Sequence, residues 1–242
     1  MDQDYYRQMA ALQSDHWWYE GRRQILARLI KRLRLPKQAK ILEAGCGPGA
    51  NLSMLSCFGD LSAFEPEQYA ADHAAKISGV NVKTGDLPGN IPFDQQFDLI
   101  GAFDVIEHID NDVEALTALG DALKDRGRAI FTVPAHQWLW SRHDDINHHK
   151  RRYSRKQFKA ALELAGFTVQ KISYYNMWLF PLAVCVRFGK KAIGAQDKND
   201  VTMPAPFVNA VLQYFFASEQ YMLPYMNLPF GLSIIAICTR HK

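Results

Sequence analysis

The fold class of this chain is decided by Lys40-Ile41-Leu42-Glu43-Ala44-Gly45-Cys46-Gly47-Pro48-Gly49-Ala50-Asn51-Leu52. The apolar beginning of this stretch predicts a short strand, the three glycines a tight turn, and the end the start of a helix. Glycine lets the backbone approach a ligand where a Cβ would block it, and a helix N-terminus offers free N–H groups to that ligand. An acid, Glu43, stands two residues before the first glycine. The stretch therefore predicts one wall of a small-molecule site.

The composition is that of a globular protein in a reducing compartment. The chain has 242 residues, of which 48% are hydrophobic and 22% charged, and this suits one large α/β domain or one domain with an insertion. The four cysteines are far apart and form no Cys-x-x-Cys pair, which argues against a zinc ribbon or a disulfide framework. The N-terminus is acidic and polar, and no apolar run reaches about 18 residues. We therefore expect no signal peptide, no transmembrane helix and a cytoplasmic location.

Strand and helix patterns alternate along the chain after residue 38. Strands are expected at 41–43, 61–65, 80–84, 97–103 and 129–133, and helices between them at 50–58, 67–78 and 112–124. A capping box, Ser154-x-x-Gln157, opens a further helix at 155–165, and strands are expected at 167–175 and 232–238. This alternation predicts a parallel sheet with helices on both faces, whose ligands bind outside the carboxyl ends of the strands.

Acidic residues follow the strands at intervals of about one β–α unit. Glu65 ends the second strand, where a carboxylate can take both hydroxyls of a ribose. Asp86 follows the third strand and can accept a hydrogen bond from an adenine amino group. Glu43 suits an ammonium group and would repel a pyrophosphate. These three acids indicate a ligand in which adenosine is linked to an amino acid.

These residues resemble the class I S-adenosylmethionine-dependent methyltransferase family. The matching elements are Glu43–Gly49, Glu65, Asp86 and the segment Phe103–His108, and the resemblance covers most of residues 38–176 and 231–242. It implies a Rossmann-like, seven-stranded and mostly parallel sheet with helices on both faces and an antiparallel last strand. It also implies S-adenosyl-L-methionine as the cofactor and S-adenosyl-L-homocysteine as its product.

A closer resemblance is to a bacterial subgroup of that family. The subgroup begins with His16-Trp17-Trp18-Tyr19 and Arg22-Arg23, continues with segments like 133–144 and 148–154, and ends with Leu228-Pro229-Phe230-Gly231. The paired tryptophans also resemble those of the quinone O-methyltransferases, a weaker similarity.

Family roles transfer residue by residue to an expected cofactor site. The methionine part is expected against Glu43 and the glycines, the ribose against Glu65, the adenine against Asp86, and the methyl-donor side against the end of the fourth strand. A packing role would suit His108 equally well. The complete expected set is Trp18, Arg22, Glu43, Gly45, Cys46, Gly47, Gly49, Glu65, Pro66, Asp86, Leu87, Phe103, Asp104 and His108.

The segment 136–153 follows the fifth strand and is rich in histidine. A hydroxyl acceptor benefits from a general base whose pKa lies near neutrality. We expect His149 or His143 to be that base, oriented by Asp144. Loop-anchoring hydrogen bonds are a simpler reading of the same residues. A metal site is a further alternative, but the spacing matches no familiar ligand pattern, so no metal is expected.

Three parts are expected along the chain. Residues 1–37 form an N-terminal helical lid or a helix stapled to the domain by aromatic residues, and 38–176 with 231–242 form the cofactor-binding domain. The remaining part, 177–230, is too long for a hairpin connection and reads as an insertion, apolar at 177–188 and amphipathic at 207–222. With the basic run Lys150–Lys159 beside it, the insertion favours a substrate cap or a peripheral membrane contact.

The sequence thus predicts a methyltransferase that uses S-adenosylmethionine, with O-methylation of a small or lipid-linked acceptor favoured. An RNA methyltransferase is one alternative, but no RNA-binding module is appended, so nucleic acid is not the expected partner. A NAD-dependent oxidoreductase is disfavoured by the Gly-x-Gly-x-Gly spacing and by Asp86. Neither Asn/Asp-Pro-Pro-Tyr nor a Pro-Cys pair follows the fourth strand, which argues against DNA methylation at amino groups or at cytosine carbon. The oligomeric state stays open.

Overall fold

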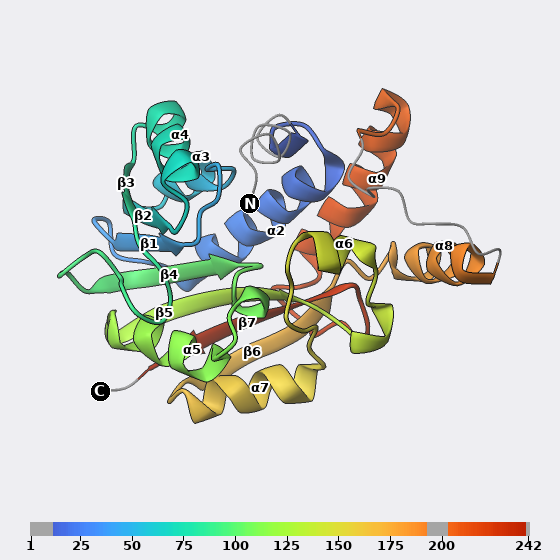
Figure 1. Ribbon diagram of the computed structural model, residues 1–242. Helices are drawn as coiled ribbons and strands as arrows, with labels where there is room; N and C mark the ends of the chain where they lie inside the picture. The colour runs from blue at the N-terminus through green and yellow to red at the C-terminus, as the bar shows by residue number, and fades with distance from the viewer. Residues whose placement is uncertain (1–11, 193–202, 241–242) are drawn as a thin grey trace.

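A seven-stranded sheet forms the centre of the computed structural model, which describes residues 12–192 and 203–240 (Figure 1). The strand order is β3-β2-β1-β4-β5-β7-β6, and β7 runs antiparallel to both of its neighbours. The mostly parallel sheet with an antiparallel last strand is confirmed. The strands are β1 Lys40–Ala44, β2 Asp60–Glu65, β3 Asn81–Thr84, β4 Phe97–Phe103, β5 Leu123–Pro134, β6 Thr168–Tyr175 and β7 Ser233–Thr239.

The described part of the chain contains eight labelled helices, and short 3₁₀ turns lie at Ile106–His108, Gln137–Leu139 and Glu219–Tyr221. The expected capping box of Ser154 and Gln157 opens α7. The aromatic residues Tyr5 and Tyr6 of the expected lid lie outside the described residues. The helices are α2 Trp17–Leu33, α3 Leu52–Ser56, α4 Gln68–Ser78, α5 Asp112–Asp121, α6 Arg142–Ile146, α7 Arg155–Leu164, α8 Phe180–Ala192 and α9 Pro206–Ser218.

The sheet separates two hydrophobic cores because successive side chains of a strand point to opposite faces. In β1, Leu42 packs in the core that contains α5 and α7, whereas Ile41 packs in the core that contains α2, α3 and α9. In β4, Ile100 and Leu99 divide between the same two cores. Burial on both faces explains why these strands read as continuous apolar runs in the sequence.

The predicted ends of two helices are wrong. The helix expected at 50–58 is only α3, Leu52–Ser56, because the glycine turn extends to Leu52, whose N–H donates to the carbonyl of Gly49 at 3.2 Å. The helix expected at 112–124 ends at Asp121. Leu123 begins β5 instead and pairs with Phe97, so the core rather than helix propensity decides the fate of residues 123 and 124.

Helix α9 and the 3₁₀ turn after it pack on the N-terminal helix α2 and on the end of β6. Phe216 of α9 is fully buried, stacks on Tyr175 at a ring-centroid distance of 5.9 Å and lies against Gly21 of α2. The buried carboxylate of Glu219 accepts backbone N–H groups from Asn176 and Met177 at 2.7 and 2.6 Å. The amphipathic helix expected at 207–222 is shorter, since it ends at Ser218 and a 3₁₀ turn follows. Across the described residues, every helix is too short or too polar to cross a bilayer.

The contact between Gly21 and Phe216 gives a test of this packing. A Cβ at Gly21 would lie 2.6 Å from the Phe216 ring, whereas a Cβ at Gly189 of α8 would meet nothing within 4 Å. Glycine to alanine in a helix stabilises by about 1 kcal/mol when space allows, and overpacking costs about 1–3 kcal/mol. We expect Gly21→Ala to lower the free energy of unfolding in urea and Gly189→Ala to leave it equal or higher. Equal stabilisation by both variants would contradict the packing of α9 on α2.

Candidate active site

The glycine turn leaves an open cradle at the carboxyl end of β1. Gly45, Gly47 and Gly49 have φ values of 67°, 53° and 98°, a backbone region that residues with a side chain rarely adopt. A Cβ at Gly47 would meet no atom within 4 Å, so the backbone is bare on the side that faces outward. A Cβ at Gly45 would lie 2.8 Å from Val105, which places the turn against the segment after β4. A ligand can therefore approach the backbone of Gly47 directly.

Glu43 brings a buried carboxylate to this turn. The residue is 1% exposed, and its Oε1 accepts a hydrogen bond from Asn51 Nδ2 at 2.7 Å. Its Oε2 is buried and has no hydrogen-bond partner in the described chain. Burial raises the pKa of Glu43 to about 7, against the lowering effects of Asn51 and Arg22. A buried carboxylate with one unused oxygen suits a ligand that carries a positive group.

Glu65 faces the same turn from the end of β2. It is 6% exposed, and its Oε2 accepts the N–H of Gly47 at 2.9 Å. Pro66, the residue after it, is exposed, while Cys46 inside the turn is buried. Asp86 lies beyond β3, where its backbone exchanges two hydrogen bonds with Asn90 and its side chain is exposed. Leu87 is half-buried beside it. The strand ends thus present Glu43, Glu65 and Asp86 along one edge, in the expected order.

Trp18 and Arg22 reach this edge from α2. The Arg22 guanidinium is 5% exposed and pairs with the carboxylate of Asp104, which follows β4. Its central carbon lies 4.3 Å from the centre of the Trp18 ring, a cation–π contact. Its Nε is buried without a hydrogen-bond partner among the described residues. Phe103 is buried in the core on the α2 side of the sheet. Arg22 thereby joins the N-terminal helix to the end of β4.

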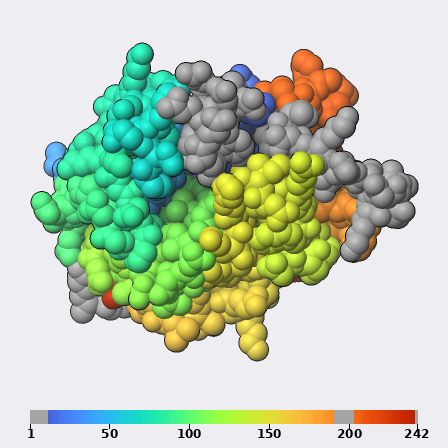
Figure 2. Space-filling view, in the orientation of Figure 1, coloured from blue at the N-terminus to red at the C-terminus, as the bar shows by residue number. Residues whose placement is uncertain are grey.

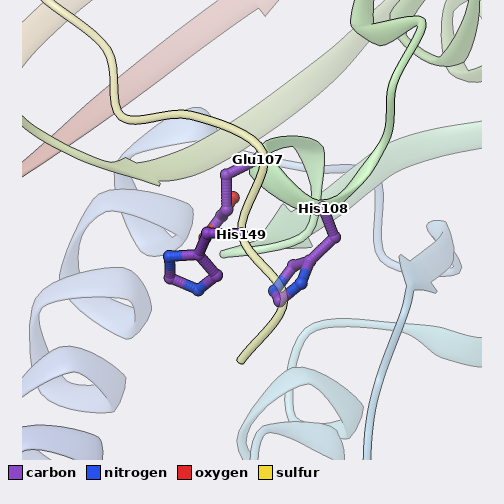
Figure 3. Close-up of side chains that lie close together, drawn as sticks. All are labelled: Glu107, His108 and His149. Carbon is purple, nitrogen blue, oxygen red and sulfur yellow. The ribbon is translucent and has the colours of Figure 1, made fainter. Parts of the chain in front are cut away.

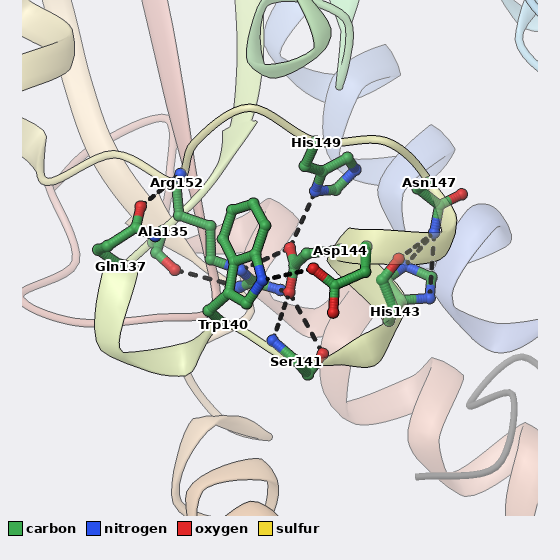
Figure 4. Close-up of polar contacts among 10 residues, drawn as sticks. Ala135, Gln137, Trp140, Ser141, His143, Asp144, Asn147, His149 and Arg152 are labelled. Atoms are coloured by element: carbon green, nitrogen blue, oxygen red, sulfur yellow. Dashed lines mark hydrogen bonds and ion pairs between the residues drawn. The ribbon is translucent and has the colours of Figure 1, made fainter.

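The segment 136–150 lies beside the end of β4 on the same face, yellow-green next to green in Figure 2. A buried ion pair holds this segment (Figure 4): Arg152 Nε donates to Asp144 Oδ1 at 2.7 Å, and its Nη2 donates to Oδ2 at 3.0 Å. The N–H of Ser141 donates to the same carboxylate at 2.8 Å. These donors hold the pKa of Asp144 well below its usual range, although burial acts in the opposite direction.

Of the two histidines expected as the base, His149 lies in a polar network with Asp144. Its Nδ1 lies 2.9 Å from Asp144 Oδ1, so the expected orientation by Asp144 is present. His143 instead lies against Asn147, whose Nδ2 is 3.2 and 3.3 Å from the two ring nitrogens. The ring centres of His143 and His149 are 6.3 Å apart. The geometry therefore favours His149 over His143 as the chemically active histidine.

Glu107 joins His108 and His149 in a cluster that the sequence interpretation missed (Figure 3). Glu107 is fully buried in the 3₁₀ turn after β4, and neither carboxyl oxygen has a hydrogen-bond partner in the described chain. Burial and the nearby Asp104 raise its pKa well above the ordinary range, against lowering effects of its own backbone N–H and of Arg152. Burial and His149 lower the pKa of His108 to about 4. The only sequence signal was the adjacent pair Glu107-His108.

The first three cations of the basic run at 150–159 are engaged with acidic side chains. Arg152 is 7% exposed and engaged with Asp144. Lys150 pairs with Asp110 at 3.2 Å and Arg151 with Asp112 at 3.0 Å. These acids reduce the charge that residues 150–152 offer to a phosphate or an anionic membrane, and contact of the run with either stays a prediction.

The ion pair of Asp144 can be tested against its exposed neighbour Asp145. Removing one partner of a buried pair leaves the other charge uncompensated and costs about 3–5 kcal/mol. We expect Asp144→Asn to lower the free energy of unfolding in urea by that amount. Asp145→Asn should change it by less than about 1 kcal/mol, because its bond to Trp140 Nε1 is exposed. Similar losses in both variants would show that burial of Asp144 is not what anchors the segment.

The fold is shared with solved methyltransferase structures of low sequence identity. One is a candidate methyltransferase from Bacillus halodurans, with 17% identity, a TM-score of 0.60, and coverage of 90% of this chain and 99% of that chain. Another is an S-adenosylmethionine-dependent methyltransferase from Clostridium acetobutylicum, with 12% identity, a TM-score of 0.61, and coverage of 93% and 92%. A third is phosphoethanolamine N-methyltransferase 2 of Haemonchus contortus in complex with S-adenosyl-L-methionine, with 16% identity, a TM-score of 0.60, and coverage of 90% and 52%.

No curated protein matches the sequence significantly. The family whose pattern matches is the methyltransferase domain, over residues 17–172. This range contains α2 with Arg22, the glycine turn, Glu65, the Glu107 cluster and Asp144. The expected class of enzyme is confirmed: the chain belongs to the methyltransferase domain family.

Proposed function

We propose that this enzyme transfers the methyl group of S-adenosyl-L-methionine to a hydroxyl group of a small or lipid-linked acceptor. The observation that carries the donor half is the pairing of a bare glycine turn with two buried carboxylates, Glu43 and Glu65. The unused Oε2 of Glu43 fits the ammonium group of the donor, and Glu65 at the end of β2 fits its ribose hydroxyls. The donor supplies a methyl group already activated by a sulfonium, so the chain has to bind and align rather than activate it.

Arg22 and Asp104 complete the donor side. Arg22 is a buried cation at the junction of α2 and β4, and its unpartnered Nε suits the carboxylate of the donor. Trp18 covers its guanidinium. The N-terminal helix therefore contributes to the donor site as well as to the fold, in keeping with a lid role for this part of the chain.

The proposal that the acceptor is a hydroxyl group rests on His149. With Nδ1 held by Asp144, the ring is fixed in orientation, and Nε2 is left for other chemistry. A hydroxyl group attacks a methyl carbon better once its proton has been removed, whereas a neutral amine needs no such step. A histidine with a carboxylate partner at this position therefore favours a hydroxyl acceptor. His149 would remove the proton of that hydroxyl group.

The lipid-linked option rests on the apolar surface of α8 and α9. Both helices expose large apolar side chains: Leu182 is 55% exposed, Phe188 56%, Phe207 79% and Tyr214 74%. Phe188 stacks with the exposed Trp138 of the 136–150 segment at 6.2 Å, so the apolar surface reaches the segment that also carries His149. Apolar helix faces with aromatic residues bind at the surface of a bilayer. This surface would bring an acceptor with an apolar tail to the site.

The rival functions receive less support. Because the chain belongs to the methyltransferase domain family, the alternative function of a nicotinamide-dependent oxidoreductase is disfavoured. An RNA acceptor would need free cationic side chains for the phosphate backbone, yet Lys150, Arg151 and Arg152 are paired with acids.

Donor binding can be tested by calorimetry with S-adenosylhomocysteine and, separately, with NAD. We expect the wild-type chain to bind S-adenosylhomocysteine and not NAD. Loss of two hydrogen bonds to a charged group costs about 3 kcal/mol or more, so Glu65→Ala should weaken binding by at least about 100-fold. The exposed neighbour Glu67 provides the control, and Glu67→Ala should bind like the wild type. Wild-type affinity in a folded Glu65→Ala variant, or binding of NAD alone, would contradict the proposal.

Membrane contact can be tested by co-sedimentation with neutral phosphatidylcholine vesicles. We expect the wild-type chain to sediment with the vesicles and the double variant Leu182→Glu/Phe207→Glu to lose this binding. The control variant Ile77→Glu/Leu164→Glu alters apolar residues that are 59% and 76% exposed on α4 and α7, and it should bind normally. Negligible binding by the wild type, equal binding by all three, or self-association of the wild type without vesicle binding would each contradict a lipid surface as the partner.

A further inference from the structure

Glu107 is a buried acid whose surroundings leave it uncompensated. It has no exposed surface, and neither of its carboxyl oxygens has a hydrogen-bond partner among residues 12–192 and 203–240. Burial of a polar group without hydrogen bonds costs several kcal/mol, and burial of a lone charge costs more. Such a group calls for a proton or for a cation close to its oxygens.

Two histidine nitrogens lie next to this carboxylate. His108 follows Glu107 in the chain, and His149 comes from the segment beyond α6. One ligand atom from each of the three residues lies within 4.8 Å of the others, and the two rings stand at 89° with centres 4.7 Å apart (Figure 3). Donor atoms about 2.1 Å from one tetrahedral zinc ion lie about 3.4 Å from each other. Side-chain movements of about 1.4 Å or less would therefore bring the three donors onto one ion.

The backbone holds the two segments of this cluster together. The N–H of Lys150 donates to the carbonyl of Glu107 at 2.8 Å, and the N–H of His149 donates to the carbonyl of Asp144 at 2.9 Å. The first bond fastens the segment of His149 to the turn that carries Glu107 and His108, and the second fixes His149 to α6. The three donors are thus arranged before any ligand arrives.

Asp144 supplies the partner that metal-bound histidines usually have. It lies 2.9 Å from Nδ1 of His149, and it is itself fixed by Arg152 and Ser141. Histidine ligands typically donate their second ring N–H to a carboxylate, which sets the tautomer and turns the other nitrogen toward the metal. Here that nitrogen is Nε2.

We infer that Glu107, His108 and His149 form a binding site for one divalent transition-metal ion, with Asp144 as the outer partner of His149. Two imidazoles and one carboxylate are a ligand set typical of zinc and related ions, and they leave a coordination position open. This inference differs from the expectation from sequence that no metal is held. Binding of the ion is independent of the proposed reaction, and only its use there rests on that proposal. An ion on Nε2 of His149 would occupy the atom proposed to take the acceptor's proton, so in the metal-bound enzyme the ion, as a Lewis acid, would make an acceptor hydroxyl more acidic in place of that base.

The full-length chain, freed of metal with a chelator, tests this site without donor or acceptor. Calorimetry with zinc chloride should show one strong site, and titration with cobalt chloride should produce visible absorption bands of a protein-bound ion. Glu107→Gln and His149→Asn should each weaken binding of both ions at least about tenfold. His148→Asn changes an exposed histidine beside the site and should bind like the wild type.

Thermal unfolding without metal shows whether each variant is folded. Added zinc should raise the melting temperature of the wild type and of His148→Asn, but not that of Glu107→Gln or His149→Asn. No one-to-one binding by the wild type, unchanged binding in folded Glu107→Gln, or equal weakening in His148→Asn would overturn the site and leave Glu107 as a protonated acid. None of these results bears on S-adenosylhomocysteine binding, so a failed metal site and a failed donor site are distinguishable.

Discussion

The burial of carboxyl groups at the carboxyl edge of the sheet is the constraint on which the rest of this structure depends. Glu43, Glu65 and Glu107 are each at most 6% exposed and stand at or just after the ends of β1, β2 and β4. Buried carboxylates are stable only when donors or cations face them. Gly47 donates to Glu65 and Asn51 to Glu43, yet one oxygen of Glu43 and both of Glu107 keep no partner in the described chain. The edge is therefore built to receive positive groups.

Arg22 connects this edge with the helical parts of the molecule. It enters from α2 and pairs with Asp104, so the N-terminal helix is held to the site by charge as well as by its apolar face. The same helix packs against α9 through Gly21 and Phe216. Helix α2 thus contacts both the carboxyl edge of the sheet and α9.

The positions of the acids at the strand ends could be predicted from the sequence, because strand ends follow from local patterns. Glu43, Glu65 and Asp86 lie on the expected edge for this reason. Glu107 and Arg152 could not be found in this way. Their meaning depends on contacts between segments about 40 and 8 residues apart, such as Lys150 N–H to Glu107 and Arg152 to Asp144. The ends of α3 and α5 were missed because a turn and a core position override helix propensity.

The sequence by itself determined the alternation of strands and helices, the glycine turn and the acids beside it, since alternating apolar patterns and turn glycines act over a few residues. Tertiary structure alone decided which polar residues became buried. It paired Lys150, Arg151 and Arg152 with Asp110, Asp112 and Asp144, and it brought the pair Glu107-His108 into a cluster with His149. The physical reason is that a charge acquires its role from the groups packed around it, and these come from distant parts of the chain.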